Sequence, residues 1–149
     1  MKKIAVVGSR RMSAYGKEVI NQLLIKNYEL RNREVEIVTV RVSGCNREII
    51  RVSEKLKLKI KIFEGENFQK LNYEVADYAD CLVIIEGGEN SGTILLAQNF
   101  VEKGKEVYCV PGRITDEGSV ATNWLIRQGA VLLQKVDDLT EGANIENND

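Results

Sequence analysis

Residues 4–11 read Ile-Ala-Val-Val-Gly-Ser-Arg-Arg, a short apolar run that passes directly into a glycine, a hydroxyl and two arginines. A run of this kind is typical of a buried strand in a parallel sheet. The residues after it are typical of the loop that leaves such a strand. We therefore interpret this stretch as the first strand and first loop of an α/β fold.

Similar runs recur along the rest of the chain. Apolar runs at 4–7, 35–42, 58–63, 81–85, 106–110 and 130–133 alternate with segments of helical period. This alternation predicts an α/β fold, a doubly wound and mainly parallel six-stranded sheet in the order 3-2-1-4-5-6, with helices on both faces. Apolar stripes at helical spacing are expected to pack on the sheet, among them Phe68, Leu71, Val75 and Tyr78, and Val120, Trp124 and Leu125.

The composition limits the class of protein. A chain of 149 residues, 44% of them hydrophobic, can bury one core, so we expect one domain over residues 1–140 and an acidic, disordered tail over 141–149. No apolar run approaches the length that spans a bilayer, so we expect no membrane partner and a cytoplasmic location. The three cysteines lack C-x-x-C spacing and are typical of buried thiols in a reducing compartment.

The chain contains no histidine. This absence excludes Ser-His-Asp and Cys-His catalysis and every zinc site that needs an imidazole. We expect neither a metal nor a cofactor.

Charge is balanced overall but segregated along the chain. Residues 1–63 hold 15 basic and 6 acidic side chains, whereas residues 64–149 hold 6 and 16. Such asymmetry marks either an anion-binding face or an unevenly decorated surface. Lys57, Lys59 and Lys61 alternate with apolar residues, as expected for a guarded edge strand that needs no ligand.

Two loops are expected to form a binding crevice. In a doubly wound sheet the ligand lies beyond the carboxyl ends of the strands where their order reverses, here between the first and fourth strands. The loops that leave these strands, 8–16 and 86–93, are rich in Gly, Ser and Thr. Glycine admits a ligand to the backbone, hydroxyls donate to phosphate, and helix starts offer unpaired N–H groups. The candidate phosphate-binding residues are Gly8, Ser9, Arg10, Arg11, Gly87, Gly88, Ser91, Gly92 and Thr93, with Ser43 and Gly44 after the second strand as further candidates.

Simpler readings of these loops stay open. The hydroxyls could merely cap tight strand-to-helix turns with nothing bound. Neither loop is a Walker A motif or a G-x-G-x-x-G fingerprint, so dinucleotide-dependent redox chemistry is disfavoured. Glu86, at the end of the fourth strand, is the one candidate catalytic residue, as a general base for glycosidic-bond cleavage. We prefer a carboxylate that orients the loop by accepting N–H bonds, because no second catalytic partner is evident.

Three blocks of the sequence resemble the DNA-processing protein A family (DprA, also called Smf) of Rossmann-like proteins. Residues 4–16 are similar to the family's opening strand and G-S-R loop, and residues 79–93 to its strand ending in Glu and its S-G-S/T helix start. Residues 104–112 and 122–130 are similar to its G-R-E-V-x-x-V-P-G and T-N-x-L-I-x-x-G-A segments. The resemblance implies a Rossmann-like fold. It places Asn72, Pro111, Gly112, Arg113 and Asn123 at the rim of the crevice.

The sequence also departs from the family pattern. The family's R-N-R falls at Leu71-Asn72-Tyr73, and its S-G-x-A-x-G-I-D stretch does not continue after Val42-Ser43-Gly44. A longer central segment and the accessory domains of many members are missing. We therefore expect a minimal and divergent version of the fold, for which the resemblance supports phosphate or nucleotide binding more strongly than DNA processing.

Three functions remain as hypotheses. The first is a non-catalytic module that binds single-stranded DNA in the crevice between the first and fourth strands. The second is a sensor of a small nucleotide or nucleotide-derived signal, favoured by the lack of stacking aromatics expected around the crevice. The third, which we favour least, is a nucleotide N-glycosidase that uses Glu86. The resemblance also implies a homodimer.

Overall fold

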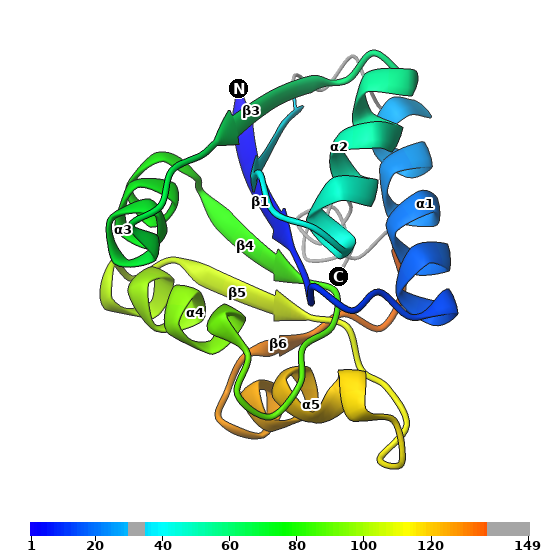
Figure 1. Cartoon of the computed structure of the whole chain (residues 1–149), viewed down its shortest axis with the longest axis vertical. Coiled ribbons are helices and arrows are strands. Elements are labelled where there is room, and N and C mark those ends of the chain that lie inside the picture. The colour runs from blue at the N-terminus through cyan, green and yellow to red at the C-terminus, as the bar shows by residue number, and fades with distance from the viewer. Residues whose placement is uncertain (30–34, 137–149) are drawn as a thin grey trace, which may run out of the picture.

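The computed structural model describes residues 1–29 and 35–136 and contains one six-stranded sheet in the order β3-β2-β1-β4-β5-β6 (Figure 1). Every strand pair is parallel, which confirms the predicted fold class and strand order. The strands are β1 (Lys2–Val7), β2 (Val35–Val40), β3 (Lys59–Phe63), β4 (Cys81–Ile84), β5 (Glu106–Cys109) and β6 (Val131–Leu132). The acidic tail predicted for residues 141–149 lies outside the described residues.

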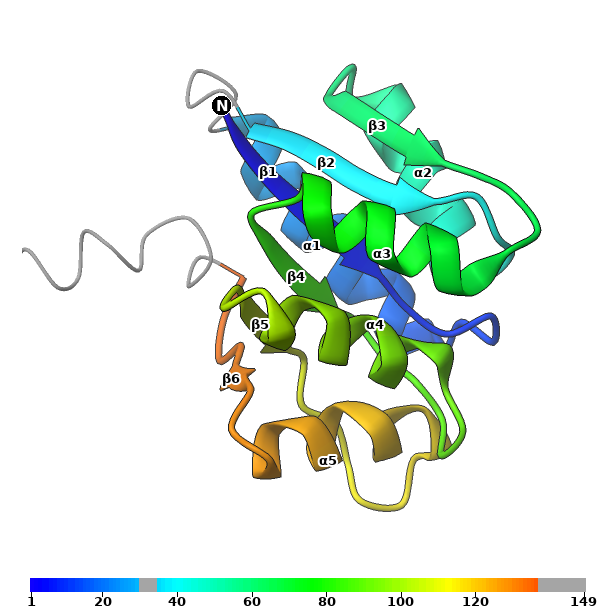
Figure 2. The same ribbon diagram turned by 90° about the vertical axis from the view of Figure 1, so that its left-hand side faces the viewer.

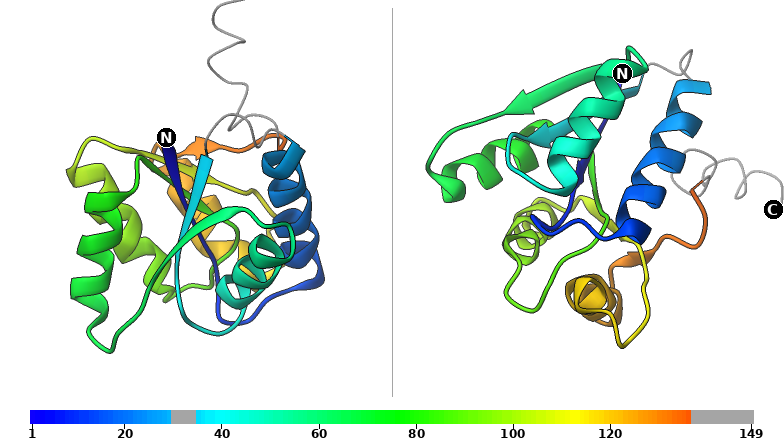
Figure 3. Two further views of the ribbon diagram at one scale, coloured as in Figure 1. Left: turned by 90° about the horizontal axis from the view of Figure 1, so that it is seen from above. Right: turned by 45° about the vertical axis from the view of Figure 1, so that its right-hand side comes forward.

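Helices cover both faces of the sheet. They are α1 (Ala14–Glu29), α2 (Cys45–Lys55), α3 (Phe68–Tyr78), α4 (Gly92–Glu102) and α5 (Val120–Arg127), which follows the short 3-10 helix η2 (Glu117–Ser119). Figure 2 shows α3, α4 and α5 in front of the sheet and α1 and α2 behind it. The left panel of Figure 3 shows the sheet between these two helical layers, seen from above.

Strand β1 explains why the run at 4–7 is apolar without alternation. Ile4 and Val6 belong to the core under α1 and α2, whereas Ala5 and Val7 belong to the core under α3, α4 and α5. Successive side chains of a strand point to opposite faces, so a strand covered on both faces needs apolar residues throughout. Burying each large aliphatic side chain contributes roughly 1.5–3 kcal/mol.

Two of the predicted helical stripes are partly wrong. Leu71 and Val75 of α3 are buried as expected, but Phe68 is 49% exposed. Helix α5 buries Ala121, Thr122 and Leu125 instead of Val120 and Trp124, which are exposed. The buried face of α5 therefore contains Ala121 and Leu125, each one residue after the positions 120 and 124 that the apolar pattern indicated.

The edge strand of the sheet and the burial of the cysteines agree with the expectations from the sequence. Strand β3 is an edge strand with Lys59 and Lys61 exposed. Cys45, Cys81 and Cys109 are all buried and form no disulfide. Burial raises the pKa of their thiols to about 12, 11 and 12, respectively. Among the described residues, no helix has the length and apolar character needed to cross a membrane.

Candidate functional site

A buried amide fastens the end of β1 to the end of β2. The Oδ1 atom of Asn46 accepts a hydrogen bond from the Gly8 N–H at 3.0 Å, and its Nδ2 donates to the Val40 carbonyl at 3.0 Å. Asn46 is among the buried polar residues. Because the N–H of Gly8 is already partnered, a phosphate at this point would have to displace Asn46.

Two glycines allow the loop after β1 to pack closely against the start of α2. A Cβ on Gly8 would lie 2.6 Å from Cys45 Cβ, closer than real Cβ atoms come to any neighbour. Gly44 has φ +83°, and a Cβ there would lie 2.5 Å from the carbonyl carbon of Arg10. The Cys45 N–H also donates to the Ser9 carbonyl at 2.9 Å. The predicted candidates Ser43 and Gly44 thus adjoin the Gly-Ser-Arg loop.

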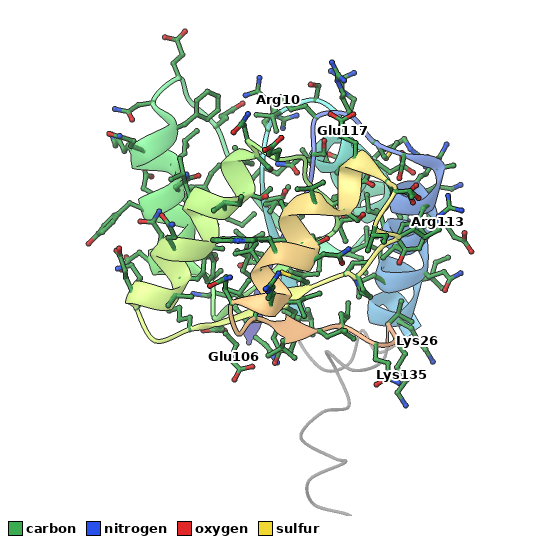
Figure 4. All side chains as sticks on the ribbon, turned by 90° about the horizontal axis from the view of Figure 1, so that it is seen from below. Arg10, Lys26, Glu106, Arg113, Glu117 and Lys135 are labelled. Carbon is green, nitrogen blue, oxygen red and sulfur yellow. The ribbon has the colours of Figure 1, made fainter. Side chains whose placement is uncertain are left out.

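Arg10 projects from this loop onto an aromatic ring. Its Cζ atom lies 5.3 Å from the centroid of Phe68, the first residue of α3. Both side chains are exposed, and Arg10 forms no ion pair within the part of the chain that the structure describes. Figure 4 places Arg10 at the same edge of the molecule as Glu117, opposite Glu106 and Lys26.

The position of Phe68 corrects an expectation from the sequence. We expected no stacking aromatic at the crevice, and Phe68 was assigned to the helical stripe that packs on the sheet. The ring instead lies beside Arg10. Asn72 follows it by four residues on α3 and is partly buried. Residues four apart share a helix face, so the predicted rim residue Asn72 is a neighbour of Phe68.

Glu86 holds the start of α1. Its Oε1 accepts from the Ser13 N–H and its Oε2 from the Ser13 hydroxyl, both at 2.7 Å, and Cys45 Sγ lies 3.5 Å from Oε1. The Ser13 hydroxyl in turn accepts from the Gly16 N–H at 2.9 Å, which caps α1. Glu86 is 4% exposed, and a Cβ on Gly16 would lie 2.6 Å from its Cδ, so the glycine leaves room for the carboxylate. The carboxylate therefore orients a loop.

The turn that begins α4 is capped by its own hydroxyls. Ser91 Oγ lies 2.7 Å from Thr93 Oγ1 and accepts from the Thr93 N–H at 3.2 Å. Gly87 is fixed from the other side, because its N–H donates to the Gly118 carbonyl at 2.7 Å. Gly88 is partly exposed, Gly92 is exposed, and neither has an atom near the place of a Cβ. These contacts are those of a capped turn that encloses Gly87 and leaves Gly88 and Gly92 open.

A cavity adjoins Glu86 and the end of the Arg10 loop, where Ser13 both bonds Glu86 and lines the cavity. Its volume is about 400 Å³. Its polar and charged lining comes from the end of β4, the start of α1 and the stretch from β5 into α5, and includes Ser13, Tyr15, Glu86, Arg113, Thr115, Asp116, Glu117, Ser119 and Thr122. Pro111 and Gly112 line it as well, and Asn123 brackets Gly112 with hydrogen bonds to its N–H at 3.2 Å and its carbonyl at 3.0 Å.

The charges of this cavity disfavour a phosphate. Three carboxylates, those of Glu86, Asp116 and Glu117, face one cation, Arg113. That cation already pairs with Asp116 at 3.0 Å. The Tyr15 hydroxyl donates to the Pro111 carbonyl at 2.7 Å, and burial, with Glu18 and Glu86 nearby, raises the pKa of this phenol.

The predicted residues therefore fall into separate groups. The loop after β1 and the start of α2 hold Gly8, Ser9, Arg10, Arg11, Ser43 and Gly44, with Asn72 on α3. The turn before α4 holds Gly87, Gly88, Ser91, Gly92 and Thr93. Pro111, Gly112, Arg113 and Asn123 lie at the cavity. Sequence reasoning missed Asn46, Ser13 and Phe68. The resemblance covered only Ser13, in the block 4–16, and assigned no role to it.

Comparisons with known proteins agree with this fold. The DprA protein of Bacillus subtilis is 27% identical, over 94% of this chain and 58% of its own length. Among solved structures, DprA of Streptococcus pneumoniae matches with TM-score 0.80 and 23% identity, over 95% of this chain and 62% of that one. A structure of DprA from Helicobacter pylori that addresses its single-stranded DNA binding mode matches with TM-score 0.75 and 18% identity, over 97% and 81%.

At these identities the structural likenesses show the fold alone. This chain spans less than two thirds of the length of the curated relatives it matches. A family model described as DNA recombination-mediator protein A matches residues 42–144, well over half of the sequence. The chain belongs to the DNA recombination-mediator protein A (DprA) family.

Proposed function

We propose that this chain binds the sugar-phosphate backbone of single-stranded DNA at the carboxyl edge of its sheet, with Arg10 as the principal cation. One observation carries the proposal. Arg10 is an exposed arginine in the loop after β1, at the point where the strand order reverses, and it has no carboxylate partner among the described residues. Guanidinium groups bind phosphate through paired hydrogen bonds, and a ligand of a doubly wound sheet lies at this edge.

Membership of the family supports a nucleic acid as the ligand. The related protein from Helicobacter pylori has a single-stranded DNA binding mode. In the proposed mode Ser9, Arg11 and Ser43 extend the contact around Arg10. Gly88 and Gly92 form the open end of the path near α4. Because Asn46 occupies the Gly8 N–H, the contact depends on side chains more than on a backbone cradle.

The cavity beside Glu86 takes no phosphate in this proposal. Its carboxylates would repel the backbone, so we propose that the strand passes on the Arg10 side. Both oxygens of Glu86 accept hydrogen bonds from Ser13, so we propose binding without turnover. The homodimer implied by the resemblance stays a prediction.

Fluorescence anisotropy with a labelled single-stranded oligonucleotide tests the proposal. Wild-type affinity should fall steeply with salt, because phosphate contacts release counterions. Arg10→Ala should weaken binding for all sequences and lower the slope of log K against log salt by about one. Arg127→Ala is the matched control. It removes an exposed arginine from the last turn of α5, before β6 and so at the amino edge of the sheet, and should leave binding unchanged.

Two results would overturn the proposal. Wild-type protein that binds no oligonucleotide removes the function, and Arg10→Ala that binds like wild type removes the site. Calorimetry with mononucleotides covers the alternative ligand. Tight binding of a mononucleotide without oligonucleotide binding would identify a small-nucleotide sensor.

A further inference from the structure

Cationic side chains line the outer face of α2. Arg47, Arg51 and Lys55 are spaced by four residues and are all exposed, whereas Ile49 and Val52 pack in the core between α2 and the sheet. Side chains four apart stand one above the other on a helix, about 6 Å apart along its axis. We call these three residues the basic stripe, which runs along nearly the whole helix.

The stripe keeps free positive charge. Two acidic residues belong to the same helix, of which Glu48 is buried and pairs with Arg51 at 2.7 Å, and Glu54 is exposed. Arg47 and Lys55 form no ion pair within residues 1–29 and 35–136. Like charges four residues apart destabilise a helix, so the stripe is a cost to the unbound protein that a polyanion would remove.

The stripe begins beside the loop that carries Arg10. The Cys45 N–H, in the first turn of α2, donates to the Ser9 carbonyl at 2.9 Å, and Gly44 packs against the backbone of Arg10. Arg47 follows in the same turn of the helix. A hydrogen bond therefore joins the segment that bears the principal cation of the proposed DNA site to the segment that bears the first cation of the stripe.

Lys57 adds a cation beyond the other end of α2. The sequence pattern placed it in the edge strand, but β3 begins at Lys59, and Lys57 follows the C-cap of α2. Its φ is +57°, in the left-handed region where helices usually end on glycine. Lysine is less stable than glycine in this conformation. Its exposed side chain lengthens the row of cations on α2.

We propose that the basic stripe and Lys57 bind the backbone of the DNA strand that leaves the Arg10 site. This second contact rests on the proposed DNA-binding function and extends it from the carboxyl edge of the sheet along the outer face of α2. No aromatic residue occurs in residues 45–57, so the contact recognises phosphates and not bases. The helix begins where the sequence departs from the family's S-G-x-A-x-G-I-D pattern, so the stripe is a feature of this chain.

The test uses anisotropy with two oligo-dT strands, the shortest that wild type binds and one of about 25 nucleotides. The short strand occupies the Arg10 site, and the long strand also reaches α2. For the long strand, Arg47→Ala with Lys55→Ala should lower the slope of log K against log salt by about 1.4, because each lost phosphate contact removes about 0.7. The same double variant should bind the short strand as wild type does.

Lys57→Gly separates binding from stability. Glycine relieves the left-handed conformation, so the midpoint of urea unfolding should rise. The salt slope for the long strand should nevertheless fall by about 0.7. A residue that acts only through the fold would lose binding only together with stability.

Arg127→Ala is the matched control for Lys55→Ala. Each substitution removes one exposed cation from the last turn of its helix, so the net charge and the helix dipole change alike. Lys55→Ala should lower the long-strand slope by about 0.7, and Arg127→Ala should change neither strand. Urea unfolding followed by circular dichroism shows that every variant is folded.

Each contrary outcome has one meaning. The stripe is overturned if the double variant and Lys57→Gly keep the wild-type slope for the long strand, if they weaken both strands equally, or if Arg127→Ala loses as much as Lys55→Ala. In each of these cases the proposed function still stands, provided that binding of both strands depends on Arg10. Wild type that binds neither strand overturns the proposed function itself.

Discussion

The carboxylate of Glu86 accepts two hydrogen bonds from Ser13, one from the N–H and one from the hydroxyl, each at 2.7 Å. This contact joins the end of β4 to the start of α1 across 73 positions of sequence. A hydrogen bond to a charged group stabilises a fold more than a neutral one. The contact therefore fixes the end of the loop after β1, at Ser13, three residues after Arg10.

Glu86→Gln tests this contact. Glutamine keeps one acceptor oxygen, and its amide group would face a donor of Ser13. We expect the free energy of unfolding, measured by urea denaturation, to fall by about 2 kcal/mol. Glu89→Gln, in the exposed part of the same loop, should change it by less than about 0.5 kcal/mol. Equal stability of the two variants would show that the Ser13 contact contributes nothing.

Gly16→Ala tests the space around the same carboxylate. An alanine in the first turns of α1 would normally stabilise the helix, by about 1 kcal/mol. Here the new Cβ would lie 2.6 Å from Glu86 Cδ, so we expect a net loss of stability instead. Gly92→Ala in the first turn of α4 meets no atom within 4 Å and should be neutral or stabilising. The thermal unfolding temperature should fall for Gly16→Ala and should not fall for Gly92→Ala.

The sheet could be predicted from the sequence because each strand has a local signature. The run at 4–7 is apolar on both faces, and the Lys59 to Lys61 alternation marks an edge. Phe68 could not be placed in this way, because it fits the apolar stripe of α3 but stands at the helix start. A helical Cα–Cβ bond tilts toward the N-terminus, so this side chain projects beyond the strands and onto the loops.

The sequence pattern also could not identify hydrogen-bond partners that are distant in the sequence. Asn46 looks like a surface residue at the start of a helix, and its burial depends on how the ends of β1 and β2 meet. The cavity depends likewise on the path of residues 110–119, which no periodicity predicts. Composition and spacing place a loop at the correct edge of the sheet. Composition and spacing do not identify the side chains that form hydrogen bonds with the backbone of that loop.

Asn46→Ala should destabilise the protein strongly. The substitution leaves the Gly8 N–H and the Val40 carbonyl without their buried partner. Each unsatisfied buried group costs about 1–3 kcal/mol, so we expect a loss of about 3 kcal/mol in urea denaturation. Asn90→Ala, at an exposed position after β4, is the control and should be neutral. A loss below about 1 kcal/mol would show that water replaces the Asn46 amide.

The three cysteines should be unreactive while the protein is folded. Burial raises the pKa of each thiol, most of all for Cys45 and Cys109, to about 12, so the thiolate is scarce at neutral pH. An aromatic disulfide reagent should label no thiol of the native protein within the time in which it labels all three in urea. Rapid labelling of one native thiol would contradict the buried positions.

Glu48 should make stability depend on pH in the acid range. Arg51 donates to Glu48 at 2.9 and 2.7 Å and Asn21 at 3.0 Å, and Arg51 above all lowers the pKa of this buried carboxyl from 4.5 to about 2. A lowered pKa in the folded state means that the stabilisation is complete above pH 4.5 and is lost as pH falls toward 2. Since Arg51 is half exposed, we expect a loss of about 2 kcal/mol, less than the full shift implies.

Other carboxylates also titrate in this range, so the measurement is a difference. Wild type and Glu48→Gln are unfolded with urea at several pH values between about 6 and 2, and the difference in their unfolding free energies is followed. That difference should shrink as pH falls. Glu48→Gln lacks the charged carboxylate at every pH, and protonation removes the same charge from wild type at low pH. A difference that stays constant would mean that Glu48 titrates as it does in the unfolded chain. The pair with Arg51, which lies within α2, would then contribute no pH-dependent stability.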